Sequence, residues 1–191
     1  MKKAIITIAG SLGSGKSSTA KALAQALGFK HYSSGDLFRK MATERGVSVE
    51  AINQTAEVQK DLDHRVDEWL QELYKTEEGF VVDSRMAWHW MPDSFKVFLT
   101  LDSDTAASRI FAQIQNGGRV SEHADSQDEV RASIERRLAS EQKRYFDLYG
   151  VDPRDPKNFD LVIDTKDGDL ASVTKLALDA YEKWRSSEKP L

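Results

Sequence analysis

A glycine-rich loop near the N-terminus strongly restricts the folds that this chain can adopt. Residues 10–17 read Gly-Ser-Leu-Gly-Ser-Gly-Lys-Ser, which matches the phosphate-binding pattern G-x-x-x-x-G-K-[ST] at every fixed position. Residues 4–9 form a β-branched run typical of a strand buried on both faces, and residues 17–27 carry apolar side chains at helical spacing. Because this loop binds phosphates when it joins a strand to a helix, we interpret it as a phosphate-binding loop rather than a chance Gly/Ser turn.

The chemistry of the loop gives its residues definite roles. Its backbone N–H groups point inward and cradle phosphate oxygens, and the positive end of the following helix adds to the attraction. The charge of Lys16 suits the β- and γ-phosphates, and the hydroxyl of Ser17 suits a magnesium ion. The residues expected to hold a nucleoside triphosphate are Gly10, Ser11, Gly13, Ser14, Gly15, Lys16, Ser17 and Ser18.

The rest of the chain alternates strand patterns with helix patterns. Strands are predicted at residues 4–9, 30–32, 80–83, 95–101 and 159–165. Helices are predicted at residues 17–27, 35–45, 49–75, 105–114, 128–148 and 170–184, the third of these as two helices. Such alternation predicts a three-layer α/β/α P-loop NTPase fold with a five-stranded parallel sheet.

Two segments interrupt the alternation, and we expect binding groups and a lid there. We expect one domain over residues 1–191, with a core of residues 1–33, 79–115 and 150–191. A helical insert would span residues 34–78, and a small lid with its return helix would span residues 116–149.

Composition excludes several classes of function. The net charge of −4 argues against a surface that coats nucleic acid, and the absence of cysteine excludes disulfides and thiolate chemistry. No stretch approaches the ~20 apolar residues of a membrane span, and the first apolar run is too short for a signal peptide. We expect a cytoplasmic monomer that binds small nucleotides, with no nucleic-acid or membrane partner.

Two further segments carry polar residues directly after predicted strands. Arg39 lies about one turn into the helix that follows residues 30–32, where a guanidinium can grip a phosphate. Asp83 ends the third predicted strand, beside the loop, and can orient magnesium or bind a second substrate. Arg85, two residues later, again suits a phosphate. Taken alone, the Arg39 segment would better fit a capped helix with a surface arginine, and Asp83 with Arg85 could be an N-cap with a solvent arginine. Beside a phosphate-binding loop we favour a functional role for both.

The order of these segments resembles the nucleoside monophosphate kinases, and most of all the short archaeal-type cytidylate kinases. The segments that carry the resemblance are the loop and residues 34–39, 44–48, 62–67 and 144–152. It covers roughly residues 4–182 and implies ATP as phosphate donor, Mg²⁺, and CMP or dCMP as acceptor. In that family Arg39 and Arg85 would hold the acceptor phosphate. The other residues implied for the acceptor site are Ser34, Gly35, Asp36, Asp63 and Asp67.

The resemblance also implies residues around the donor. Arg109 would pack on the donor base, Arg119 would belong to the lid, and Arg144 on the return helix would face the transferring phosphate. Arg136 and Arg137 point about 100° apart on that helix, so one of them is expected to face the site. With Lys16, the catalytic residues implied are Arg119, Arg137 and Arg144, and the metal ligands are Ser17 and Asp83.

The chain departs from the family after its third predicted strand. Ser84 stands where glycine is usual, and Trp88 and Trp90 stand where small residues are usual. The tryptophans could pack in the core, which we favour, or stack on the acceptor base. The departure keeps open a kinase for another small acceptor, such as a different nucleotide, a nucleoside or a metabolite. A nucleotide-binding regulatory protein is a third hypothesis, which the complete set of charged residues disfavours.

Overall fold

The computed structural model describes residues 2–46, 56–117 and 124–187. Five strands of these residues form one parallel sheet in the order β2-β3-β1-β4-β5. The strands are β1 (Ile5–Gly10), β2 (Lys30–Ser33), β3 (Phe80–Asp83), β4 (Phe95–Thr100) and β5 (Leu161–Asp164). The predicted five-stranded parallel sheet is therefore confirmed, with shifts of one or two residues at the strand ends.

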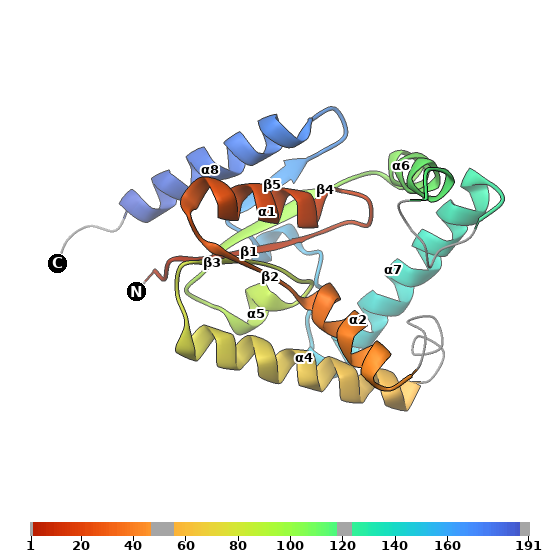
Figure 1. The fold of residues 1–191 in the computed structure, drawn as a ribbon, viewed down its shortest axis with the longest axis horizontal. Coiled ribbons are helices and arrows are strands. Elements are labelled where there is room, and N and C mark those ends of the chain that lie inside the picture. Colours follow the sequence, from red (N-terminus) through yellow and green to blue (C-terminus); the bar gives the residue numbers. More distant parts are fainter. Residues whose placement is uncertain (1, 47–55, 118–123, 188–191) are drawn as a thin grey trace.

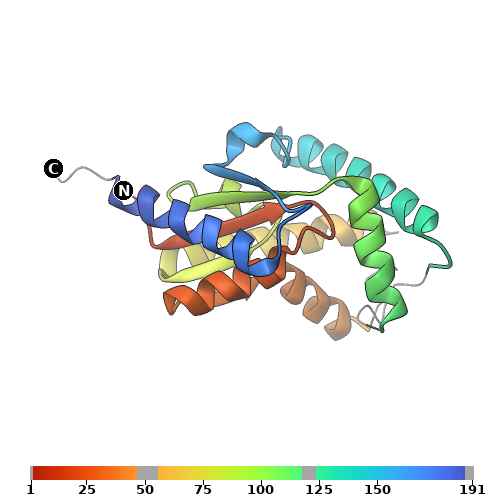
Figure 2. The same ribbon diagram turned by 90° about the horizontal axis from the view of Figure 1, so that it is seen from above.

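Helices lie on both faces of the sheet. They are α1 (Lys16–Leu27), α2 (Ser34–Glu44), α4 (Ala56–Thr76), α5 (Ala87–Trp90), α6 (Ser103–Gln115), α7 (Gln127–Tyr149), α8 (Leu170–Ser186) and a short 3₁₀ turn, η1 (Pro156–Asn158). α1 and α8 cover one face, whereas α4 and α5 cover the other (Figures 1 and 2). The three layers give the P-loop α/β fold predicted from the sequence.

The apolar residues of the central strand β1 contribute to two hydrophobic cores, one on each face of the sheet. Side chains alternate across a strand, so Ile6 and Ile8 pack towards Leu23 of α1, while Ile5 packs towards Leu70 of α4. All five side chains are fully buried. Burying each contributes about 1.5–3 kcal/mol relative to an exposed side chain. The continuous apolar run in β1 thus fits a strand covered on both faces.

The order of the strands fixes where a ligand can bind. β1 lies between β3 and β4, so the chain order reverses on the two sides of β1. In such sheets the crevice at the carboxyl ends of the strands, beside this reversal, receives the ligand. The glycine-rich loop follows β1 at this edge, and Asp83 ends β3 beside it. α7 crosses the same end of the molecule and packs on α6 (Figure 1).

Some local expectations need correction. The helix predicted at residues 35–45 begins one residue earlier, and its N-cap is Ser33, whose Oγ accepts from the N–H of Asp36. The helix α5 was not predicted. The predicted helical segment 49–75 and the predicted lid segment 116–149 fall partly outside the described residues.

None of the helices in the described segments is both long enough and apolar enough to cross a membrane.

Candidate functional site

The loop between β1 and α1 has a backbone that requires glycine. A Cβ atom on Gly10 would lie 2.3 Å from the carbonyl oxygen of Leu99 in β4, so no larger residue fits there. Gly15 caps α1 in the left-handed conformation, with φ of 83°, and a Cβ atom there would meet nothing within 4 Å. Any residue with a side chain would be strained at this φ, which explains the glycine at this position. The open space beside Gly15 suits a phosphate that approaches the start of α1.

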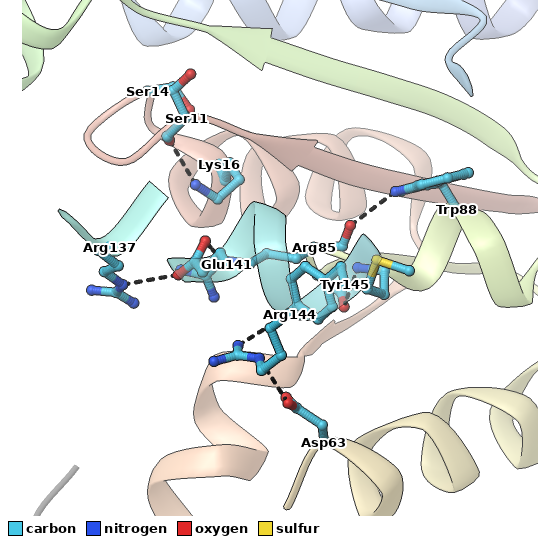
Figure 3. Close-up of polar contacts among 12 residues, drawn as sticks. Ser11, Ser14, Lys16, Asp63, Arg85, Trp88, Arg137, Glu141, Arg144 and Tyr145 are labelled. Carbon is cyan, nitrogen blue, oxygen red and sulfur yellow. Dashed lines mark hydrogen bonds and ion pairs between the residues drawn. The ribbon is translucent and has the colours of Figure 1, made fainter. Parts of the chain in front are cut away.

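The side chains of the loop converge on one carbonyl group. Lys16 Nζ donates to the carbonyl oxygen of Ser11 at 2.7 Å, and Ser14 Oγ donates to the same oxygen at 2.8 Å (Figure 3). Burial, and after it the nearby charge of Arg85, lower the pKa of Lys16 to about 7. Among the described residues no carboxylate pairs with Lys16 Nζ, which suits this group to meet a phosphate.

Asp83 gathers three side chains at the carboxyl end of β3. Its Oδ1 accepts from Ser17 Oγ at 3.2 Å and from Ser33 Oγ at 3.0 Å, and its Oδ2 lies 2.8 Å from His31 Nε2. The predicted metal ligands Ser17 and Asp83 are therefore in contact. The described residues contain no group of three or more His, Asp or Glu able to hold a metal. One carboxylate and one hydroxyl fit Mg²⁺, which takes its remaining ligands from phosphates and water.

Two arginines from distant parts of the chain meet at one carboxylate. Glu141 Oε2 accepts from Arg85 Nε at 2.6 Å, and Glu141 Oε1 accepts from Arg137 Nε at 3.0 Å (Figure 3). Arg85 follows β3, whereas Arg137 and Glu141 lie on α7. The charges of Arg85, Glu141 and Arg137 all act on Lys16, so this basic group lies beside the loop. Arg136 and Arg137 are both exposed, but Arg137 bonds Glu141 and is therefore the better candidate.

Arg144 and Asp63 form a second charged contact. On α7, Arg144 follows Glu141 by about one turn and Arg137 by about two turns. Arg144 Nε lies 3.0 Å from Asp63 Oδ2, but the two atoms are buried and not aligned for a hydrogen bond (Figure 3). Burial raises the pKa of Asp63 to about 6, although Arg144 opposes this rise. A buried carboxylate with an unsatisfied oxygen calls for a further donor.

Asp67, one turn further along α4, is already bonded on both oxygens. Trp90 Nε1 donates to its Oδ1 at 2.8 Å, and the hydroxyl of Tyr149 donates to its Oδ2. Asp67 therefore joins α4 to α5 and to the end of α7. Asp63 and Asp67 share one face of α4 as expected, yet their surroundings differ.

The two tryptophans after β3 have distinct environments. Trp88 is buried against Phe98 and Phe159, and its Nε1 donates to the carbonyl oxygen of Arg85 at 2.9 Å. Trp90 is half-buried and holds Asp67. Both side chains are tied to other parts of the protein, which agrees with the core packing that we favoured. His89 packs edge-on against both and is also structural.

The remaining predicted residues lie around this centre. Arg39 is exposed on α2, where it pairs with Asp36 and lies 3.5 Å from the Cβ position of Gly35. Ser34 Oγ donates to the carbonyl oxygen of Asp83 at 3.4 Å. Arg109 on α6 donates to the carbonyl oxygens of Thr165 and Lys166, at 2.8 and 2.9 Å, so it fixes the turn after β5. Ser18 is exposed in the first turn of α1. Arg119 lies outside the described residues.

Sequence reasoning missed three residues of the site: His31, Glu141 and Tyr149. One signal for Glu141 was present, because it continues the buried stripe of α7 that runs through Val130 and Ile134 to Tyr145. A carboxylate on an apolar stripe indicates a buried partner. His31 and Tyr149 carried no such signal, since their partners come from distant segments.

Comparisons with known proteins relate the chain to one family of kinases. The profile of the cytidylate kinase-like family matches residues 5–167. A cytidylate kinase of Haloarcula marismortui is 35% identical over 183 residues, covering 94% of this chain and 90% of that protein. A cytidylate kinase of Methanobrevibacter smithii is 32% identical over 174 residues, covering 91% and 96%. A solved shikimate kinase from Bacteroides thetaiotaomicron has a TM-score of 0.60 at 16% identity, covering 95% and 98%, and shows the shared fold alone.

Proposed function

The chain belongs to the cytidylate kinase-like family and is a nucleoside monophosphate kinase, and we propose that it transfers the γ-phosphoryl group of ATP to CMP or dCMP. The observation that carries the proposal is the basic group of Arg85 and Arg137 beside Lys16 of the phosphate-binding loop. An acceptor phosphate is already an anionic nucleophile, so the reaction needs in-line placement and charge stabilisation rather than a strong general base. Arginines and a lysine meet that need.

On the donor side, the loop would hold the β- and γ-phosphates of ATP. The backbone N–H groups of residues 13–17 cradle the oxygens, and Lys16 turns from the carbonyl oxygen of Ser11 to the phosphates. Ser17 and Asp83 would hold Mg²⁺, which would supply positive charge to the transferring phosphoryl group. Arg109 keeps the turn after β5 in place for the donor base.

On the acceptor side, Arg39 and Arg85 would bind the phosphate of the monophosphate. The side chain of Arg85 is held in the centre of the site, whereas Arg39 lies on α2 with its guanidinium exposed. Arg137 and Arg144 on α7 would stabilise the charge that develops on the moving phosphoryl group. Ser34, Gly35 and Asp36 form the start of α2 beside this phosphate.

The choice of cytosine rests on the relatives and on Asp63. Its buried Oδ2 lacks a hydrogen bond, so the exocyclic amino group of cytosine would supply a donor that uracil lacks. Asp67 is less suited to this role, because Trp90 and Tyr149 already bond both of its oxygens. We further propose that the segment 34–78 forms the acceptor-binding insert and that the segment 116–149, with Arg119, forms the lid that excludes water.

A coupled ADP-release assay tests this proposal. The protein, with ATP and Mg²⁺, is assayed against CMP, dCMP, UMP, AMP and GMP in parallel. We expect kcat/KM to be highest for CMP or dCMP, with the amino-to-carbonyl change in UMP costing at least about tenfold. Turnover that is highest with AMP or GMP would reject cytidylate as the acceptor. Turnover with none of the five would point to another small acceptor and to the residues after Arg85 as its site.

A further inference from the structure

Glu141 is an acidic residue at the centre of a basic site, and the proposed reaction assigns no chemistry to a carboxylate there. Its side chain is only 12% exposed. Burial alone would raise the pKa of Glu141, but Arg85, Arg137 and Arg144 together hold that pKa below its usual value. Glu141 is therefore ionised near neutral pH, and it bears the negative charge that faces these cations from α7.

The geometry of Glu141 leaves both arginines able to bind phosphate. Each carboxylate oxygen bonds a different arginine, and each bond uses Nε rather than the terminal nitrogens. A guanidinium carries five N–H groups, so the Nε bond occupies one of them and leaves the four on the Nη atoms for other acceptors. A bidentate pair through the Nη atoms would instead have filled the edge that best binds a phosphate.

The ion pairs favour the same role. Glu141 lies between Arg85 and Arg137, so its carboxylate offsets the repulsion between these two cations. Asp83 is also a carboxylate beside the loop, but it is bonded to Ser17, Ser33 and His31 rather than to an arginine. Glu141 is thus the carboxylate in the described residues that bonds Arg85 and Arg137 at once.

We propose that Glu141 is a positioning residue that fixes Arg85 and Arg137 around the phosphoryl-transfer site. One carboxylate then aligns the arginine for the acceptor phosphate with the arginine for the transferred phosphoryl group. The inference rests on the proposed function, because it requires that these two arginines bind phosphates.

The substitution Glu141→Gln tests the inference. The amide oxygen can accept from one arginine, but the amide NH₂ group then faces the other and cannot accept from it. We expect kcat to fall between about tenfold and a hundredfold, since small misplacement of such groups has effects of this size. The KM for the acceptor should rise, while ATP affinity by calorimetry stays within about twofold, because the loop still holds the donor.

The control is Glu135→Gln, which removes a carboxylate that pairs with Arg131 on the exposed side of the same helix. It should leave kcat and both KM values unchanged. If Glu141→Gln does not fold, Glu141→Asp keeps the charge but shortens the reach to both arginines, and the same loss in kcat is expected.

Two results would overturn the inference. One is a Glu141 variant with the kcat and acceptor KM of the wild type, or with higher activity. The other is a parallel loss of ATP affinity, kcat and melting temperature, which would make Glu141 merely structural. If the wild-type protein prefers another monophosphate, cytidylate is rejected as the acceptor, but the inference about Glu141 is not. The Glu141 variants would then be compared with the wild type using that monophosphate.

Discussion

Lys16 is the residue whose replacement should separate catalysis from folding most clearly. Its ammonium group donates to the carbonyl oxygen of Ser11, and within the described part of the chain Lys16→Ala removes no ion pair. We expect kcat to fall at least about a hundredfold, as on loss of one preorganised group that stabilises the transition state. The circular dichroism spectrum should not change. Lys21→Ala, an exposed change on α1, is the control, and a folded Lys16→Ala protein with full turnover would refute the mechanism.

Arg39 should affect the acceptor rather than the donor. Its guanidinium is exposed and pairs with Asp36 on the same helix, so Arg39→Ala should change the free energy of unfolding by less than about 1 kcal/mol. We expect kcat/KM for CMP to fall at least about tenfold, with the KM for ATP unchanged. Steady-state kinetics with each substrate varied will test this, with its exposed neighbour Lys40→Ala as control. Unchanged use of CMP would remove Arg39 from the acceptor site.

Asp63 should make the stability of the protein depend on pH. Its pKa is raised from 3.8 to about 6, so between these values the folded protein binds a proton that the unfolded chain has lost. The free energy of unfolding therefore falls as pH rises through this window. Asp63→Asn should lack this component, which amounts to up to about 3 kcal/mol between pH 4 and pH 7.

Urea unfolding of both proteins across that range measures the difference. Glu68→Gln, an exposed change on the same helix, should follow the wild type at every pH. If the free energies of unfolding of the wild type and of Asp63→Asn change with pH in the same way from pH 4 to pH 7, the pKa of Asp63 is not raised by folding.

Among the elements, α4, α5 and α7 are joined through one buried carboxylate. Asp67 is 6% exposed, so removal of a donor leaves its oxygen without water or a partner. We expect Tyr149→Phe to lower the free energy of unfolding by about 1–3 kcal/mol. Tyr32→Phe is the matched control, because its partner Glu77 has a side chain 31% exposed and can bind water instead. If urea unfolding shows the same loss in the free energy of unfolding for both variants, the bond between Tyr149 and Asp67 does not join these helices as we describe.

The elements also show what the sequence could and could not predict. The strands β1, β3 and β4 were predicted well because their apolar runs are buried on both faces, and such a run can be read from local residues alone. Helix α5 was missed because four residues, Ala87–Trp90, are too few to display a period. The start of α2 was predicted one residue late, since Ser33 and Ser34 are chemically alike and either could cap a helix.

The candidate site was predicted in part for the same reason. The glycine-rich loop is contiguous in sequence, so Lys16 and Ser17 could be assigned roles directly. The contacts of Glu141 with Arg85 and of Asp67 with Tyr149 join residues more than fifty positions apart. A charge-rich helix such as α7 looks the same in sequence whether its charges meet water or one another, so these contacts needed the structure.

At the scale of the whole molecule, the sheet order brings the parts of the site together. β1 and β3 are neighbours, so the loop after one and the acidic end of the other meet at one edge. α7 passes the same end of the molecule (Figure 1), and its Glu141 bonds Arg85, which follows β3. The donor loop, Asp83 and the arginines are thus fixed by three different elements, which is the arrangement that transfer between two bound nucleotides requires.

Following the labelled phosphate tests the central claim most directly. The protein is incubated with ATP labelled in its γ-phosphate, Mg²⁺ and CMP, and the products are separated by chromatography. We predict that the label appears in CDP in step with ADP, that free phosphate stays at background, and that chelation of Mg²⁺ stops the transfer. Label that appears only in inorganic phosphate, or remains in ATP with every nucleoside monophosphate, would contradict the account.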